Sequence, residues 1–167
     1  MQHLYAPWRE SYLKEKDKSC VFCEISQNPT KDSENRVLYR NSDLFVVMNA
    51  YPYNPGHLLI IPHAHQASVE LLELNTWLNM NALAPKVLKA LYAYGAQGIN
   101  LGLNLHRNAG AGIPEHLHMH LVPRFLGDSN FMSVIAQTRV CGMDLNETYL
   151  TLKNLLEKEL GCENKCF

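Results

Sequence analysis

Three histidines alternate with apolar residues in the segment "EHLHMHLVPR", residues 115–124. Successive side chains of a β-strand point to opposite faces, so His116, His118 and His120 would share one face of such a strand. The Cα atoms of neighbouring histidines would then lie about 6.6 Å apart. Because leucine and methionine occupy the alternate positions, the spacing predicts a strand with one apolar face and one face of imidazoles.

Imidazoles in this arrangement have three ordinary uses. They can bind a metal ion, act as nucleophiles or proton donors near neutral pH, or pack as hydrogen-bonded interior residues. For a single histidine, simple packing is the usual outcome. Three polar rings on a half-buried face are costly unless each finds a partner, so strict alternation favours a shared chemical role.

A glycine-containing loop precedes these histidines. The segment "NAGAGIPEH", residues 108–116, carries Gly110 and Gly112. Glycine allows backbone amides to approach an anion closely, and successive N–H groups can bind a phosphate. A flexible turn is the competing interpretation. A phosphate bound there would lie beside imidazoles, which can attack phosphorus.

Another histidine follows a tight turn in "NPGHLLIIPHAH", residues 54–65. The Pro-Gly pair fixes the backbone just before His57 and could direct that side chain to the same face as the alternating histidines. We expect His63, which comes after the end of this strand, to be an ordinary surface histidine.

A pair of cysteines near the start of the chain has the spacing of metal ligands. Cys20 and Cys23 are separated by two residues, which lets both thiolates reach one zinc ion. A redox pair is the rival interpretation, but no β-α-β context accompanies it. Two more ligands are needed, and His65 and His116 are the best candidates. The weaker candidates are His3, His63 and His106. A closed site of this kind would be structural.

Composition narrows the class of protein. The chain has 167 residues, 47% of them hydrophobic, which is enough for one domain with a core. Its 15 basic and 16 acidic residues give a net charge of −1, so there is no electrostatic signature of nucleic-acid binding. Apolar runs are too short for a membrane span and the start lacks a signal-type stretch, so we expect a cytoplasmic protein. Five cysteines favour reduced thiols.

Hydrophobic patterning predicts strands over residues 36–41, 44–50, 57–62 and 99–107, besides the histidine strand. Because strands come in runs with helices set apart, we expect an α+β fold with an antiparallel sheet. Residues 1–19, polar with aromatic islands, are expected to form an amino-terminal arm on this domain.

Two helices are predicted. The first, over residues 75–95, would end at Gly95, and Pro85 should kink or break it. Its apolar face would consist of Trp77, Leu78, Leu88, Leu91 and Tyr92. The second helix covers residues 143–161, with Asp144 as a possible cap and Gly161 as a stop.

The motifs together resemble one family. The segment "HLHMHLV" fits the His-φ-His-φ-His-φ-φ signature of the histidine triad (HIT) superfamily of nucleotide hydrolases and transferases. "CVFCEI" resembles the zinc-binding start of many bacterial members, and "NAYPYNPGHLLIIP" resembles the ribose-side strand and its turn. "GINLGLNLHRNAGAGIPEHLHMHLVPRF" with "GDSNFMSVIAQTRV" is most similar to the branch that includes diadenosine tetraphosphate phosphorylases. The resemblance covers residues 20–140, and "APWRESYL" matches more loosely.

This resemblance implies a mechanism. His118 would be the nucleophile and would form a nucleotidyl-histidine intermediate on a dinucleoside polyphosphate, which water or inorganic phosphate would then release. His120 would hydrogen-bond the phosphate or the leaving group, and His57 would assist. The implied architecture is a single HIT domain over residues 20–167, with a long helix and a C-terminal helix, usually as a homodimer.

The resemblance also assigns binding residues. Asn49 matches the ribose-binding position, and the phosphate-side segment comprises Asn104, Gly110, Ala111 and Gly112. The implied ligands of a structural zinc are Cys20, Cys23, His65 and His116, with no organic cofactor. Many members have glutamine or serine in the loop before the triad. Here Gly112, Ile113 and Pro114 stand there, so the phosphate contacts would fall to backbone amides.

Several alternatives stay open. The protein could instead be a nucleoside phosphoramidate hydrolase, or a zinc-containing nucleotide-binding module without activity. A metalloenzyme that uses the three histidines as its metal site ranks lower, because the cysteines offer zinc a better site. DNA deadenylation, known in the superfamily, is disfavoured by the neutral charge and by the lack of a basic extension.

Overall fold

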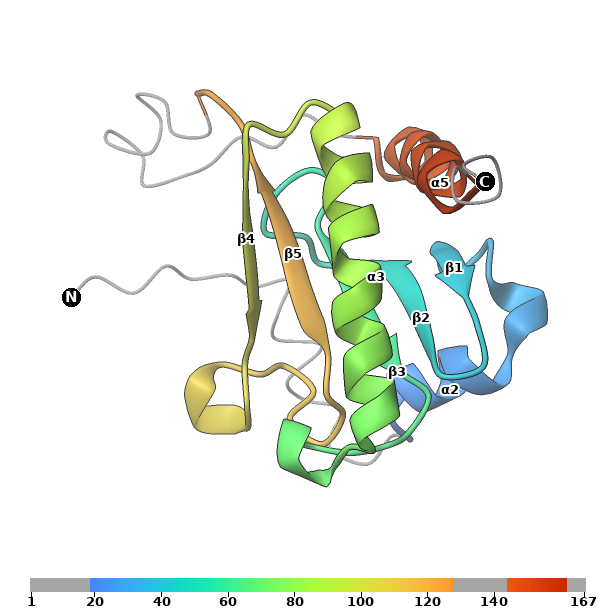
Figure 1. Ribbon diagram of the computed structural model, residues 1–167, viewed down its shortest axis with the longest axis vertical. Coiled ribbons are helices and arrows are strands. Elements are labelled where there is room, and N and C mark those ends of the chain that lie inside the picture. Colours follow the sequence, from blue (N-terminus) through green and yellow to red (C-terminus); the bar gives the residue numbers. More distant parts are fainter. Residues whose placement is uncertain (1–18, 128–143, 162–167) are drawn as a thin grey trace.

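The computed structural model describes residues 19–127 and 144–161 (Figure 1). The expected amino-terminal arm, residues 1–19, therefore lies outside the described residues except for Ser19, as do His3 and most of the segment 127–140. Among the described residues, no helix is long and apolar enough to cross a membrane.

Five antiparallel strands form one sheet in the order β1-β2-β3-β5-β4. The strands are β1 (Val37–Arg40), β2 (Leu44–Met48), β3 (Leu58–Pro62), β4 (Gly98–Leu103) and β5 (Met119–Arg124). Helices α2 (Val21–Gln27), α3 (Leu74–Ala93) and α5 (Leu145–Gly161) accompany the sheet. The expected α+β class with an antiparallel sheet, a long helix and a C-terminal helix is confirmed.

Apolar residues of β2 and β3 are buried at every position, because the sheet is covered on both faces there. The larger hydrophobic core joins one face of the sheet to α3 and α5, and includes Val46, Ile60 and Leu91. The smaller core lies on the opposite face, where Phe45 and Phe22 belong to one cluster. Figure 1 shows α3 running along the sheet with α5 beside it. The smaller core therefore anchors α2, which carries the cysteine pair.

The long helix α3 continues through Pro85, so the expected break does not occur. A proline removes one hydrogen bond to the carbonyl four residues earlier, here that of Asn81. Both residues lie on the exposed side of the helix, where water can satisfy that carbonyl.

The expected apolar face of α3 was partly wrong. Leu78 and Tyr92 are both 53% exposed. The residues that pack on the sheet also follow the helical period, but they lie on a different side of α3. They are Met80, Leu83, Ala84, Val87, Ala90 and Leu91.

The C-terminal helix α5 begins as predicted. Asp144 Oδ1 accepts hydrogen bonds from the backbone N–H groups of Asn146 (2.8 Å) and Glu147 (2.9 Å), which satisfies two donors of the first turn. Tyr149 joins the helix to β1, since its hydroxyl donates to the Val37 carbonyl (3.2 Å). Gly161 is the last described residue of the helix.

Three strand boundaries differ from the prediction by two residues or more. β2 ends at Met48, before the proline-rich loop, and β4 ends at Leu103 rather than at residue 107. His106 has a positive φ of 63°, and Arg107–Ala109 forms a short 3-10 turn. The histidine strand begins at Met119, because residues 112–116 form turns and bends.

Candidate active site and metal centre

The three alternating histidines are buried, with 1%, 6% and 8% of the surface of His116, His118 and His120 exposed. The intervening residues Leu117, Met119 and Leu121 pack into the larger core on the opposite face of the sheet. The predicted histidine face is thus confirmed, although regular strand geometry begins only at Met119.

Hydrogen bonds fix the tautomers of His57 and His120. The backbone N–H of Tyr53 donates to Nδ1 of His57 (3.1 Å), so the proton of the neutral His57 ring resides on Nε2. That Nε2–H donates to Nδ1 of His120 (3.0 Å), which places the proton of His120 on its own Nε2. His120 Nε2 is buried and has no hydrogen-bond partner among the described residues. The arrangement therefore presents one unused N–H donor.

His118 has the complementary arrangement. Its Nδ1–H donates to the backbone carbonyl of His116 (2.8 Å), which leaves the lone pair on Nε2. The ring lies between Phe22 and His120, with ring-centre distances of 5.2 and 4.9 Å. A neutral imidazole with a free Nε2 is a competent nucleophile toward phosphorus.

Burial keeps these rings neutral. It lowers the pKa of His57 to about 3, with further lowering by the charges of His120 and His118. Burial likewise lowers the pKa of His120 to about 4, with a contribution from the charge of His118. The pKa of His118 is also lowered by burial, and its hydrogen bond to the His116 carbonyl opposes that effect. At neutral pH His118 and its neighbours His57 and His120 are therefore uncharged.

A cavity of about 840 Å³ opens beside His118 and His120. Asn49 and Gly112, expected at the substrate site, line it. His57 is fully buried and is not part of the wall, so it reaches the cavity only through His120. Sequence reasoning missed further wall residues from three regions of the chain: Phe22, Tyr51, Tyr53 and Arg107.

The expected phosphate-side segment is only partly at this cavity. Asn104, Gly110 and Ala111 do not line it. The N–H groups of Gly110 and Ala111 donate to the carbonyls of Arg107 (3.0 Å) and His106 (3.3 Å), so these amides stabilise their own turn.

Asn49 supports the loop between β2 and β3 as well as lining the cavity. Its Oδ1 accepts the backbone N–H of Tyr51 (2.9 Å), and its Nδ2 lies 3.3 Å from Nδ1 of His57. Asn49, the residue expected to bind ribose, therefore also contacts His57.

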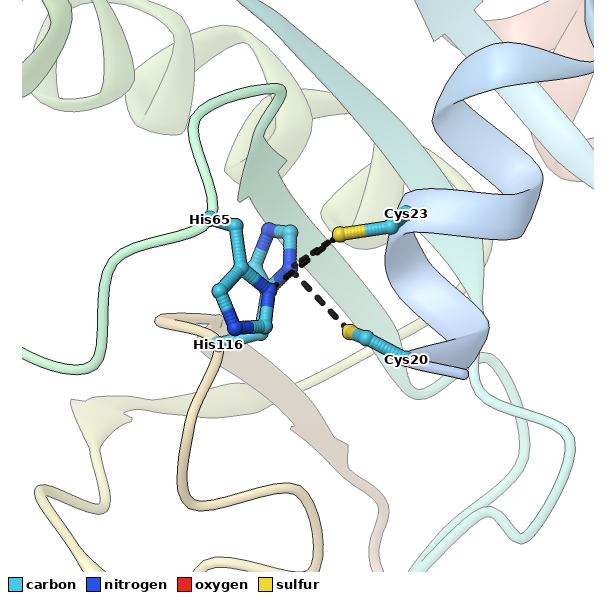
Figure 2. A group of neighbouring side chains, drawn as sticks. All are labelled: Cys20, Cys23, His65 and His116. Atoms are coloured by element: carbon cyan, nitrogen blue, oxygen red, sulfur yellow. Dashed lines mark hydrogen bonds between the residues drawn. The ribbon is translucent and has the colours of Figure 1, made fainter. Parts of the chain in front are cut away.

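The four expected metal ligands come together (Figure 2). Nδ1 of His116 lies 3.3 Å from Sγ of Cys20, and Nδ1 of His65 lies 3.2 Å from Sγ of Cys23. All four donor atoms lie within 4.8 Å of one another. Zinc takes two thiolates and two imidazoles in a tetrahedron with ligands at about 2.0–2.3 Å, so this donor set fits a structural zinc ion.

Local structure explains how these ligands meet. Cys20 precedes α2 and Cys23 lies one turn along it, so both sulfurs point the same way. His116 Nε2–H donates to the Pro62 carbonyl (2.9 Å), which directs Nδ1 toward the cysteines. Burial, together with the hydrogen bond and charge of Cys20, raises the pKa of Cys23 to about 11. The thiol of Cys23 is therefore protonated at neutral pH, and a metal ion bound there would have to displace that proton.

The histidine that was expected at the surface is partly buried instead. His63 Nε2–H donates to the Asn41 carbonyl (3.0 Å), its Nδ1 lies 2.7 Å from Ser26 Oγ, and its ring stacks on Phe45. It ties α2 to the sheet from outside the cysteine cluster.

Comparisons with known proteins agree with this geometry. The HIT domain family model matches residues 30–127, more than half of the chain. AP-4-A phosphorylase of Mycobacterium tuberculosis is 35% identical over 159 residues, covering 89% of this chain and 80% of that protein. Adenylylsulfatase HINT3 of Arabidopsis thaliana is 31% identical over 106 residues, covering 63% and 52%. A zinc-bound histidine triad family protein from Mycobacterium smegmatis superposes with a TM-score of 0.70 at 25% identity, over 86% of this chain and 97% of that one. The chain therefore belongs to the HIT domain family.

Proposed function

We propose that the protein cleaves dinucleoside polyphosphates such as diadenosine tetraphosphate through a covalent nucleotidyl intermediate on His118. One observation carries this proposal. Beside the cavity, and within the part of the chain that the structure describes, His118 keeps its Nε2 lone pair free and the neighbouring His120 presents an N–H without a hydrogen-bond partner. A nucleophile beside a hydrogen-bond donor is what displacement at phosphorus requires.

The first step is a substitution at the α-phosphorus. His118 Nε2 forms a bond to phosphorus while the bond from that phosphorus to its bridging oxygen breaks, and ATP departs with the electron pair. The Nε2–H of His120 stabilises the charge that develops on the phosphate oxygens. His57 is a positioning residue, because its Nε2–H holds His120 in the tautomer that donates.

In the second step an acceptor attacks the phosphorus of the nucleotidyl-histidine and releases His118. Inorganic phosphate would yield ADP, and water would yield AMP. The 35% identity to AP-4-A phosphorylase of Mycobacterium tuberculosis favours phosphate.

The test is an incubation of the purified protein with diadenosine tetraphosphate, with and without inorganic phosphate. ADP plus ATP that forms only with phosphate identifies a phosphorylase, and AMP plus ATP in plain buffer identifies a hydrolase. An alkaline quench preserves a phosphoramidate, so mass spectrometry should find one added AMP group on the peptide that contains His118. Turnover that survives replacement of His118 would contradict the proposal.

A substrate panel distinguishes a second candidate. The similarity to an adenylylsulfatase points to substrates whose leaving group carries no nucleoside. Higher kcat/KM for adenosine phosphoramidate or adenylyl sulfate than for the dinucleotide would favour that candidate.

We further propose that the cluster of Cys20, Cys23, His65 and His116 holds a structural zinc ion, which would tie α2 to the two histidine segments. No step of the reaction passes through it.

The protein would also pair as a homodimer, since β4 hydrogen-bonds to β5 on one side only and Leu101 is 51% exposed. Light scattering of the wild type and of Leu101→Lys tests the dimer; an unchanged dimer in the variant would exclude this edge.

A further inference from the structure

The side chains of two tyrosines that line the cavity take no part in the chemistry described so far. Tyr51 and Tyr53 lie in the loop between β2 and β3, line the cavity, and are 47% and 44% exposed. Large aromatic side chains left this open beside a reactive centre suit a ligand with an aromatic face of its own.

The order of the rings shows which part of a substrate they would meet. Phe22 lies 5.2 Å from His118, His118 lies 4.9 Å from His120, and His120 lies 5.8 Å from Tyr53. The planes of His120 and Tyr53 differ by only 13°. One aromatic residue therefore flanks the nucleophile and another flanks the donor. In an in-line displacement the leaving group departs on the side of the phosphorus opposite His118, and we place the departing half of the substrate beside His120 and Tyr53, because Phe22 occupies the other side of His118.

Two hydrogen bonds donated by backbone N–H groups hold the loop that carries the tyrosines in place. The N–H of Tyr51 donates to Oδ1 of Asn49 (2.9 Å), and the N–H of Tyr53 donates to Nδ1 of His57 (3.1 Å). Pro52 between them has a fixed φ. Because the backbone is already ordered, little conformational freedom is lost when a ligand binds to these side chains.

We propose that Tyr51 and Tyr53 form the binding site for the second, departing nucleoside, an inference that rests on the proposed function. Stacking of its base on these rings selects dinucleoside polyphosphates over substrates whose leaving group ends in a bare phosphate. Stacking of one base on one aromatic ring corresponds to a change of about 5- to 150-fold in affinity.

The experiment compares two substrates with the same reacting phosphorus. Diadenosine tetraphosphate releases ATP, whereas adenosine 5′-tetraphosphate releases triphosphate with no nucleoside. The measured quantity is the ratio of their kcat/KM values, so that effects common to both substrates cancel. We expect the wild type to prefer the dinucleotide by roughly 10-fold or more, and Tyr51→Ala and Tyr53→Ala each to lower that preference at least about 5-fold. Tyr53→Phe should keep it.

Tyr92→Ala is the matched control, because Tyr92 is 53% exposed on α3 and does not line the cavity. Its preference ratio should equal that of the wild type. Equal kcat/KM for the two substrates in the wild type would overturn the nucleoside site and leave the proposed function standing. Equal losses on both substrates in Tyr53→Ala and Tyr51→Ala would also overturn it, because the tyrosines would then only position His57 and His120.

A binding measurement separates failure of this site from failure of the proposed function. Calorimetry on His118→Asn, which cannot turn over substrate, gives the affinities for both ligands directly. Tighter binding of the dinucleotide that is lost in His118→Asn/Tyr51→Ala supports the site even if the wild type proves inactive. Equal affinities for the two ligands in His118→Asn overturn it.

Discussion

His116 and His118 are two residues apart on the same face of the chain, yet they present opposite ring nitrogens. His116 donates its Nε2–H to the Pro62 carbonyl and turns Nδ1 toward two cysteines. His118 donates its Nδ1–H to the His116 carbonyl and keeps Nε2 for the cavity. In both cases a backbone carbonyl selects the tautomer. Identical side chains thus acquire different roles from the acceptor that each one meets.

The neighbourhoods differ as well. Around His116 are two thiols and another imidazole, a set of soft and borderline ligands that suits zinc. Around His118 are the rings of Phe22 and His120 and a cavity whose wall also includes Cys20. The proposed metal centre and the proposed reactive centre therefore use different side chains, although Cys20 and His65 line the same cavity as His118.

The largest effect should come from removing the nucleophile. We expect His118→Asn to lower kcat by at least about 10³-fold, because the neighbouring His120 uses its Nδ1 lone pair to accept the hydrogen bond from His57 and cannot replace His118 as nucleophile. Product formation from diadenosine tetraphosphate measures this. Zinc content and the thermal midpoint should equal those of the wild type; a fall in either would show that the two centres are not separable.

Removal of the metal should act mainly on stability. Cys23→Ser or a strong chelator should abolish stoichiometric zinc and lower the thermal midpoint by about 10 °C, because a ligand bound only to the folded state stabilises it. Elemental analysis and calorimetry measure both. His63→Gln is the control, since His63 contacts α2 through Ser26 but lies outside the cluster. Zinc retained by Cys23→Ser would contradict the ligand assignment.

The tautomer assignment can be tested through His57. We expect His57→Asn to lower kcat by roughly 10²-fold, because His120 then loses the N–H donor that places its proton on Nε2. Single-turnover kinetics isolate the chemical step. His57→Gln, with a longer amide that can still reach His120, should recover part of the rate. An unchanged rate in His57→Asn would mean that the hydrogen bond does not orient His120.

The smallest effect concerns acid stability. His57 and His120 have pKa values lowered to about 3 and about 4, below the ordinary value near 6.5. The unfolded chain therefore binds more protons than the folded one below pH 6.5, and the free energy of unfolding should fall as pH drops from 6.5 toward 4. The slope contributed by each ring is at most about 1.4 kcal/mol per pH unit.

Urea denaturation at several pH values measures this slope. His57→Asn should flatten it by up to one proton relative to the wild type. No dependence on pH below 6.5 would show that these rings protonate equally in both states.

Local patterns in the sequence predicted much of the site. Strict alternation placed His116, His118 and His120 on one face, and the two-residue spacing of Cys20 and Cys23 indicated a shared ligand site. These signals work because side-chain direction in a strand or helix turn depends only on position along the chain.

Other features depend on contacts between distant segments, so no local pattern reveals them. Tyr53 lines the cavity because its ring packs against that of His120. His63 is half-buried because its ring stacks on Phe45. The predicted break at Pro85 was wrong, because the cost of a proline in a helix depends on whether the freed carbonyl reaches water. The short α2 gave too few residues for a periodic signal.

The carbonyl of His116 has a consequence for redesign. An engineer who replaced the four metal ligands with a packed apolar set would remove the His116 side chain, but every residue at position 116 supplies the same peptide oxygen. The oxygen must stay where it is, because the Nδ1–H of His118 is donated to it. What such a redesign has to preserve is therefore the path of the backbone between residues 116 and 118, not the identity of the side chain.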